Sequence, residues 1–142
     1  MKATDVLLGE HGACYGLFAF LEEAAPGDLR AGAALLAAVI IPHARFENER
    51  LFPALEARIG PDGPLAVMRA EHDEIEGGLA ALRTVEDPAA LRRGLRHVIA
   101  VAREHFRKEE AVLFPLADRE LSAGLLERLG EEWAAARGVA PR

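Results

Sequence analysis

Residues 43–53 read HARFENERLFP, and residues 105–115 repeat the pattern as HFRKEEAVLFP. Each copy starts with a histidine, carries a glutamate four residues later (Glu47 or Glu109) and ends in Leu-Phe-Pro. Residues four apart lie on one face of an α-helix, so the histidine and glutamate of each copy can bind one metal ion or bridge two. The repeat therefore predicts two helices that each present a metal-binding pair.

Helical periodicity extends on both sides of the repeat. Apolar residues recur at three- and four-residue spacing, and turn signals rich in proline and glycine separate the segments. We expect Pro53 to end the second helix early, and a cap or break around Ser122. The pattern predicts four long helices and a shorter fifth, near residues 4–25, 28–51, 64–85, 88–113 and 118–137.

Short connections favour antiparallel neighbours in a helical protein. The expected fold class is therefore all-α, with an antiparallel up-down four-helix bundle over about residues 4–116. A short extra C-terminal helix follows it. At this length one core is sufficient, so we expect a single domain over residues 1–142.

Six polar residues lie within the apolar rows of the four long helices. An ionised carboxylate on an apolar face is costly unless it is paired or bound to a metal. With a rise of about 1.5 Å per residue, the four histidines can meet at one depth in the bundle. A hydrogen-bonded core histidine would explain any one of them, but the set favours a shared metal centre. The six residues are His11, His43, Glu47, His72, His105 and Glu109.

The residue types indicate which metals such a centre would take. Imidazole nitrogen and carboxylate oxygen suit iron, manganese or zinc, and the set lacks the thiolates typical of a structural zinc site. Four neutral imidazoles and two carboxylates leave two divalent ions with a net positive charge. We therefore expect a bridging hydroxide or a further carboxylate.

Other chemistry-bearing residues receive simpler interpretations. His97 lies about 80° around the helix from His105 and is not expected to bind the metal. Glu49 and Glu110 are interpreted as surface charges. Cys14 lies one turn from His11 and is interpreted as a small buried thiol. Tyr15 can donate a hydrogen bond near the centre, although packing explains it equally well.

On these residues the sequence resembles the hemerythrin-like, or HHE cation-binding, family. The resemblance covers residues 4–116 and rests on His11, the two His-x-x-x-Glu segments and Glu71-His72-Asp73. It implies a four-helix bundle with a non-haem diiron centre and an oxo or hydroxo bridge, which binds oxygen or related small ligands. The ligands implied by the resemblance are His11, His43, Glu47, His72, His105 and Glu109.

Two departures separate the sequence from the oxygen-carrying hemerythrins. Those proteins have a second histidine on the third helix, four residues after the first, where this chain has Glu76. Glu76 is a further candidate ligand, but it can also leave a water-filled position or face solvent. Their last carboxylate falls five residues after the final histidine, and here both Glu109 and Glu110 are available. The missing imidazole argues against reversible oxygen carriage.

Two features break local helix rules near the candidate centre. Pro42 precedes His43 and should disrupt a hydrogen bond within the helix, and Gly77 and Gly78 follow Glu76. We hypothesise that they shape access to the metals; close helix packing is the alternative.

Composition limits the partners that we expect. The formal net charge of −6 disfavours nucleic acid and anionic membranes. No apolar run approaches the roughly 20 residues of a membrane span, and the N-terminus lacks the pattern of a secretory signal. The single cysteine, Cys14, fits a reducing cytoplasm.

The expected function is capture of oxygen, nitric oxide or iron in a sensing, storage or scavenging role. The alternative is an oxidoreductase that acts on peroxide, nitric oxide or ferrous iron. It would take electrons from a redox partner protein, because the sequence has no flavin or nicotinamide motif. A third reading is a helical interaction module with a structural zinc. The sequence leaves the oligomeric state open.

Overall fold

The computed structural model describes residues 1–139, and in this range it is all-helical, without a β-strand. The long helices are separated by the predicted turns. The elements in chain order are α1 (Ala3–Glu23), η1 (Pro26–Asp28), α2 (Leu29–Phe46), η2 (Glu47–Leu51), α3 (Phe52–Ile59), α4 (Pro64–Leu82), α5 (Pro88–Lys108), η3 (Glu109–Leu113), α6 (Phe114–Glu120) and α7 (Ala123–Ala136).

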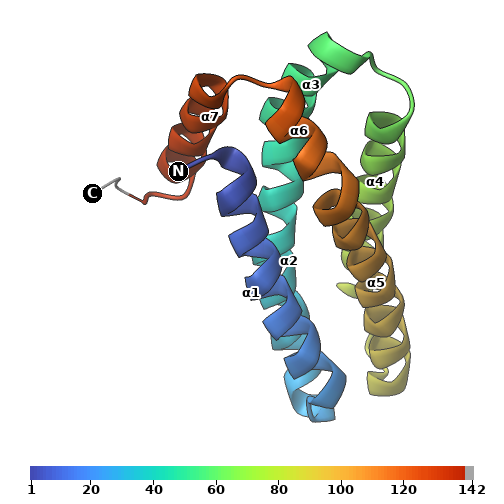
Figure 1. Cartoon of the computed structure of the whole chain (residues 1–142). Helices are drawn as coiled ribbons and strands as arrows, with labels where there is room; N and C mark the ends of the chain where they lie inside the picture. Colours follow the sequence, from blue (N-terminus) through green and yellow to red (C-terminus); the bar gives the residue numbers. More distant parts are fainter. Residues whose placement is uncertain (140–142) are drawn as a thin grey trace.

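The helices pack side by side as a helical bundle. α1 packs on α2, α4 packs on α5, and contacts between α2 and both α4 and α5 join the two pairs (Figure 1). α7 lies outside the two pairs of long helices and packs on α1, close to the N-terminus (Figure 1). The prediction of a single domain spanning residues 1–142 includes three residues outside the described range and stays a prediction.

The prediction that Pro53 ends the second helix is wrong. α2, η2 and α3 follow one another without a break to Ile59, and α5, η3 and α6 do the same to Glu120. η2 and η3 are π-helical turns, in which Phe52 N–H donates to the Glu47 carbonyl and Phe114 N–H to the Glu109 carbonyl. Each proline then falls in the first turn of the next α-helix, where its missing N–H costs little.

The fifth helix is shorter than expected. Residues 118–120 belong to α6, and α7 starts after Ser122, whose hydroxyl caps it by accepting from Leu125 N–H at 3.3 Å. Gly130 allows α7 to approach the N-terminus, because a Cβ there would lie 2.1 Å from the Met1 carbonyl oxygen.

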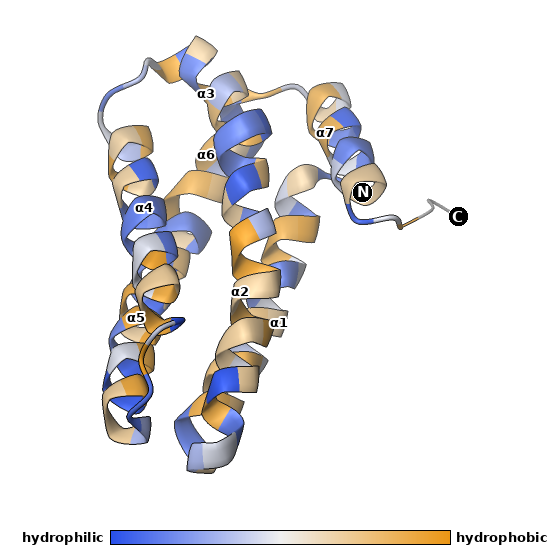
Figure 2. Ribbon diagram, turned by 180° about the vertical axis from the view of Figure 1, so that it is seen from behind, coloured by the Kyte–Doolittle hydropathy of each residue, from blue (hydrophilic) through white to orange (hydrophobic). Residues whose placement is uncertain are grey.

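Two apolar clusters fill the interior, and hydrophobic and hydrophilic residues alternate along the helices of both pairs (Figure 2). One cluster contains Cys14, Ile40, Ile75 and Ala102, and the other contains Leu7, Phe46, Met68 and Leu113. On each long helix, the candidate metal ligands lie between members of the two clusters in sequence. The polar centre is therefore enclosed by apolar packing along the bundle.

One continuous helical stretch, Pro26–Ile59, is long and apolar enough to cross a membrane by length and composition alone. Its mean hydropathy over the most apolar window is 1.3, and core helices of soluble proteins reach such values. The same stretch carries His43 and Glu47 on its buried side. The sequence-based expectation of no membrane partner stays a prediction.

The two features that break helix rules behave differently. α2 continues through Pro42. A Cβ on Gly78 would lie 2.7 Å from Val98 Cγ2, whereas a Cβ on Gly77 would meet no described atom within 4 Å. Gly78 therefore serves the close approach of α4 and α5, which is the packing alternative.

Candidate metal centre

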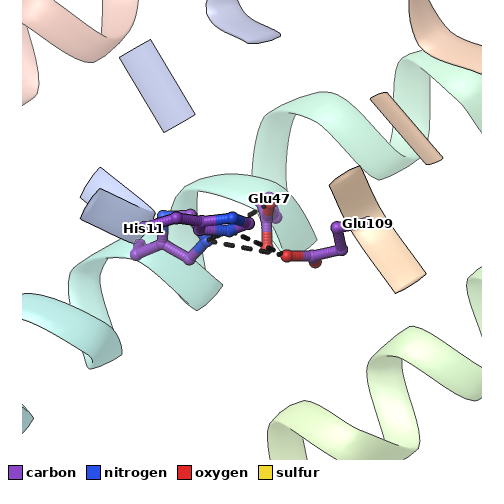
Figure 3. A group of neighbouring side chains, drawn as sticks. His11, Glu47 and Glu109 are labelled. Carbon is purple, nitrogen blue, oxygen red and sulfur yellow. Dashed lines mark hydrogen bonds and ion pairs between the residues drawn. The ribbon is translucent and has the colours of Figure 1, made fainter. Parts of the chain in front are cut away.

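Six side chains converge in the interior of the bundle, and each is at most 1% exposed. They form two groups, in which the candidate ligand atoms lie within 4.8 Å of one another. Both groups share Glu47 and Glu109, and Figure 3 shows the two carboxylates on the same side of His11. One group adds His11 and His43, and the other adds His72 and His105.

The two carboxylates each face both groups of histidines. Glu47 Oε1 lies 3.4 Å from His43 Nε2, and Glu47 Oε2 lies 3.1 Å from His72 Nε2. Glu109 Oε2 lies 3.0 Å from His11 Nε2, and Glu109 Oε1 lies 2.8 Å from His105 Nε2. This division of oxygens matches carboxylates that bridge two metal ions, each held by two imidazoles as well.

The residues present fit a pair of metal ions. Within the described residues, both oxygens of Glu47 and of Glu109 lack a hydrogen-bond partner, as do Nε2 of His72 and of His105. Buried polar atoms are nearly always satisfied, and each exception needs an explanation. Nitrogen and oxygen lone pairs that face one another in an apolar interior are explained by cations between them.

Each of the four imidazoles is oriented by a hydrogen bond on its other nitrogen. His11 Nδ1 donates to Glu110 Oε1 at 2.8 Å, and His43 Nδ1 donates to Glu10 Oε2 at 2.8 Å. The same role is filled for His72 by Asn48 Oδ1 at 2.9 Å and for His105 by Glu71 Oε2 at 2.8 Å. An acceptor at Nδ1 fixes the tautomer that leaves Nε2 free to bind a metal.

These four acceptors form a closed ring around the bundle. An acceptor on α1 orients the histidine of α2, and an acceptor on η2 orients the histidine of α4. In the same way, an acceptor on α4 orients the histidine of α5, and an acceptor on η3 orients the histidine of α1. Each acceptor directly neighbours a candidate ligand on its own helix, as Glu10 neighbours His11. Three acceptors are carboxylates and the fourth is an amide, so the two groups are not equivalent.

Most of this ring was not predicted from the sequence. Glu110 was expected to be a surface charge, whereas one Glu110 oxygen accepts hydrogen bonds from both His11 and Tyr15, each at 2.8 Å. Tyr15 therefore donates a hydrogen bond near the centre, which is one of the two interpretations that the sequence left open. Glu10, Asn48 and Glu71 each directly neighbour a candidate ligand in the sequence, but this position alone does not show that they face a histidine.

The electrostatics of the six side chains indicate which of them would lose a proton when a metal ion binds. Burial and the charge of Glu109 raise the pKa of Glu47 well above its ordinary range. Burial opposes a charge on His43, but the carboxylate of Glu47 and the hydrogen bond to Glu10 raise its pKa to about 10. Because metal ligands must be deprotonated, filling the centre would release protons.

Aromatic rings pack on the histidines from the apolar side. Phe106 stacks on His11 with ring centroids 3.8 Å apart, and Phe52 stacks on His72 at 5.4 Å with nearly parallel planes. Phe114 lies 5.3 Å from the His11 ring. These rings hold the imidazoles in place and exclude water from that side.

The other residues considered lie away from the two groups. Glu76 is half-buried and lines an apolar groove of about 420 Å³ between α2 and α4. His97 is 71% exposed beside Glu74, and Glu49 is exposed. Cys14 is buried in an apolar cluster, as expected for a small buried thiol, and burial raises the pKa of its thiol to about 12.

Comparison with known proteins gives the class to which this centre belongs. The family model described as hemerythrin HHE cation binding domain matches residues 2–117. The chain belongs to this family of cation-binding domains, and the resemblance noted in the sequence is confirmed.

A particular relative is the iron-sulfur cluster repair protein YtfE of Musicola paradisiaca. It is 32% identical over 111 residues, which are 69% of this chain and 50% of the relative. The chain thus spans about half the length of this curated relative. No solved structure matches the chain.

Proposed function

We propose that this chain is a non-haem diiron protein that binds oxygen, nitric oxide or iron in a sensing, storage or scavenging role. One observation carries the proposal: two buried pairs of histidines share two carboxylates whose oxygens are divided between the pairs. Iron is preferred to zinc because the donor set has no thiolate and the family model is that of hemerythrin.

The donor set leaves room for a small ligand. Each metal ion would receive two imidazole nitrogens and one oxygen from each of Glu47 and Glu109, and iron commonly takes further ligands in such centres. A bridging hydroxide and an exchangeable ligand would complete the coordination. Glu76 lies outside both groups, so the second imidazole of oxygen carriers has no carboxylate substitute. We therefore favour sensing or iron handling over oxygen transport.

The fold that we propose for this role is the antiparallel up-down four-helix bundle with a short C-terminal helix. Each long helix would then supply part of the centre at one depth. We propose a cytoplasmic protein, in line with the composition, and the name of the relative suggests iron–sulfur cluster damage as one condition under which to test the chain.

One contact favours the second function, a diiron oxidoreductase acting on peroxide, nitric oxide or ferrous iron. The half-buried hydroxyl of Tyr15 donates to Glu110, whose same oxygen accepts from His11. These two hydrogen bonds connect Tyr15, at the edge of the bundle, to a candidate ligand through the Glu110 carboxylate, which can accept a proton from His11. Electrons would come from a redox partner protein.

The first experiment measures metal per chain by plasma mass spectrometry after purification from iron-replete cells. The expected result is about two irons per chain in the wild type and a sharp loss in His43→Ala or His105→Ala. His97→Ala is the matched control, because that histidine is exposed on the same helix as His105. A chain that takes up no iron on anaerobic reconstitution overturns the proposal.

A second measurement separates binding from turnover. The iron-loaded protein is mixed with excess peroxide and a reductant, and peroxide consumption is followed. Consumption beyond one equivalent favours the oxidoreductase, whereas a single stoichiometric reaction favours the binding protein. A colourless zinc protein without gas-dependent spectra would instead favour a structural role for the metal.

A further inference from the structure

The C-terminal helix reaches the candidate metal centre from outside the family's common domain. The family match ends at residue 117, and α7 begins at Ala123. Arg137, directly after α7, donates from Nε to Glu10 Oε1 at 2.8 Å. The other oxygen of Glu10 accepts from His43 Nδ1 at 2.8 Å. A continuous path of two hydrogen bonds therefore joins α7 to a candidate ligand.

The position of Arg137 is fixed by the way α7 ends. Gly138 has a positive φ of 67°, and Val139 N–H donates to the Ala134 carbonyl at 2.8 Å, which closes the helix C-terminus. The Arg137 guanidinium lies over the Trp133 ring, 5.6 Å from its centroid. The side chain is 20% exposed, so solvent screens its charge only partly.

α7 itself is anchored on the N-terminal end of α1. Leu126 and Leu129 are buried, and Gly130 packs against the Met1 backbone. Because α7 is held in this way, Arg137 at its end has a fixed position relative to α1. Glu10 is 12% exposed and, within the described residues, contacts both the arginine and His43.

We infer that Arg137 is a positioning residue of the metal centre: it fixes Glu10 in the orientation that holds His43 Nε2 toward the metal, and so makes α7 part of the centre. This inference rests on the proposed metal-binding function. Arg137 belongs to neither of the two groups of candidate ligands. Arg137 acts on the position held by His11 and His43, and leaves the position of His72 and His105 to Asn48 and Glu71.

The physical argument concerns what Glu10 does without its arginine. One carboxylate oxygen would lose a charged donor in a mostly buried site, so the carboxylate would turn toward solvent to regain hydrogen bonds. His43 would then lose the acceptor that fixes its tautomer. Loss of such an acceptor typically weakens metal binding by about 10- to 100-fold. Because Arg137 acts through Glu10, we expect the lower end of that range.

The test compares Arg137→Gln with Arg137→Lys and with Arg50→Gln. Arg50 is a matched control, because its Nε lies 3.5 Å from Glu132 Oε2 and also joins the bundle to α7, at side chains about half exposed. The full-length proteins are loaded anaerobically with ferrous iron, and both binding constants are measured by chelator competition. The His43 ring resonances are recorded by NMR on the zinc-loaded proteins.

In Arg137→Gln we expect one of the two iron-binding constants to fall by about 10-fold, while the other is unchanged and the His43 resonances shift. Arg137→Lys should retain most of the affinity, and Arg50→Gln all of it. Equal losses in Arg137→Gln and Arg50→Gln, or wild-type constants in Arg137→Gln, would overturn the inference. Failure of the wild type to bind iron would instead refute the proposed function, so the two failures are distinguishable.

Discussion

Replacing Glu47 with glutamine should make the metal-free protein more stable while preventing it from binding metal. Burial and the charge of Glu109 raise the pKa of Glu47 well above the ordinary value of 4.5. An acid whose pKa is raised by folding binds a proton as the chain folds. The free energy of unfolding therefore falls as pH rises above 4.5. Glutamine is close in shape to the protonated acid and needs no proton.

The magnitude follows from the distance between the working pH and the ordinary pKa. Each pH unit is worth about 1.4 kcal/mol. Glu47→Gln should stabilise the metal-free protein by up to about 3 kcal/mol at pH 7, the limit set by the distance from the ordinary pKa, and by less than about 1 kcal/mol at pH 5. For a chain of this length the gain at pH 7 corresponds to roughly 10 °C in melting temperature.

The assay is urea unfolding of the metal-free proteins at pH 5 and pH 7, followed by circular dichroism. Glu49→Gln is the control, because Glu49 lies in the same π turn but is exposed. It should change the stability little at either pH. In the presence of iron the order reverses, because Glu47→Gln replaces one of the two carboxylate oxygens with an amide NH2 group and removes the negative charge that both metal positions share. A metal-free Glu47→Gln protein with no gain at pH 7, or with the same gain at both pH values, would refute the reasoning.

The remaining predictions concern helix packing and the ring of acceptors. Gly77→Ala should raise the free energy of unfolding by up to about 1 kcal/mol, because its Cβ meets no described atom within 4 Å. Gly78→Ala should lower it by about 1–3 kcal/mol, because its Cβ would lie 2.7 Å from Val98; equal effects in urea unfolding would contradict both. Asn48→Ala removes the acceptor of His72 and should weaken iron binding by about 10- to 100-fold in chelator competition, whereas unchanged binding would show that Asn48 does not orient His72.

The sequence predicted the helical fold from periodicity, and the helix starts near residues 4, 28, 64 and 88 lie within one residue of those observed. The ends near residues 51 and 113 were wrong because proline was taken as a stop signal. Proline disfavours a helix where its nitrogen would have to donate a hydrogen bond and where its ring clashes with the preceding turn, but it is tolerated in a first turn. In both copies of the repeat, the π turn places the proline in a new first turn, and local sequence rules do not register that change of hydrogen bonding.

The buried part of the candidate centre could be predicted because charged residues in apolar rows are unusual. The ring of acceptors could not, because a polar residue at the edge of a row is ordinarily solvated. The Glu110 side chain, for example, is 33% exposed and still binds His11. Assigning Glu10 to His43, or Asn48 to His72, also requires knowing which helices are neighbours. The contact between Arg137 and Glu10 could not be predicted for the same reason, since the two residues lie far apart in the sequence.

The Leu-Phe-Pro ending of each copy belongs to the centre as much as the histidine and glutamate do. A hydrogen bond between residues five apart brings each phenylalanine over the glutamate that starts the π turn, whereas an α-helix aligns residues three or four apart. Phe52 thereby packs on His72 and Phe114 on His11, so each copy supplies a carboxylate and also supports an imidazole from another helix. The repeat therefore specifies how the helices pack around the centre. For this reason the same residues predict both the metal ligands and the fold.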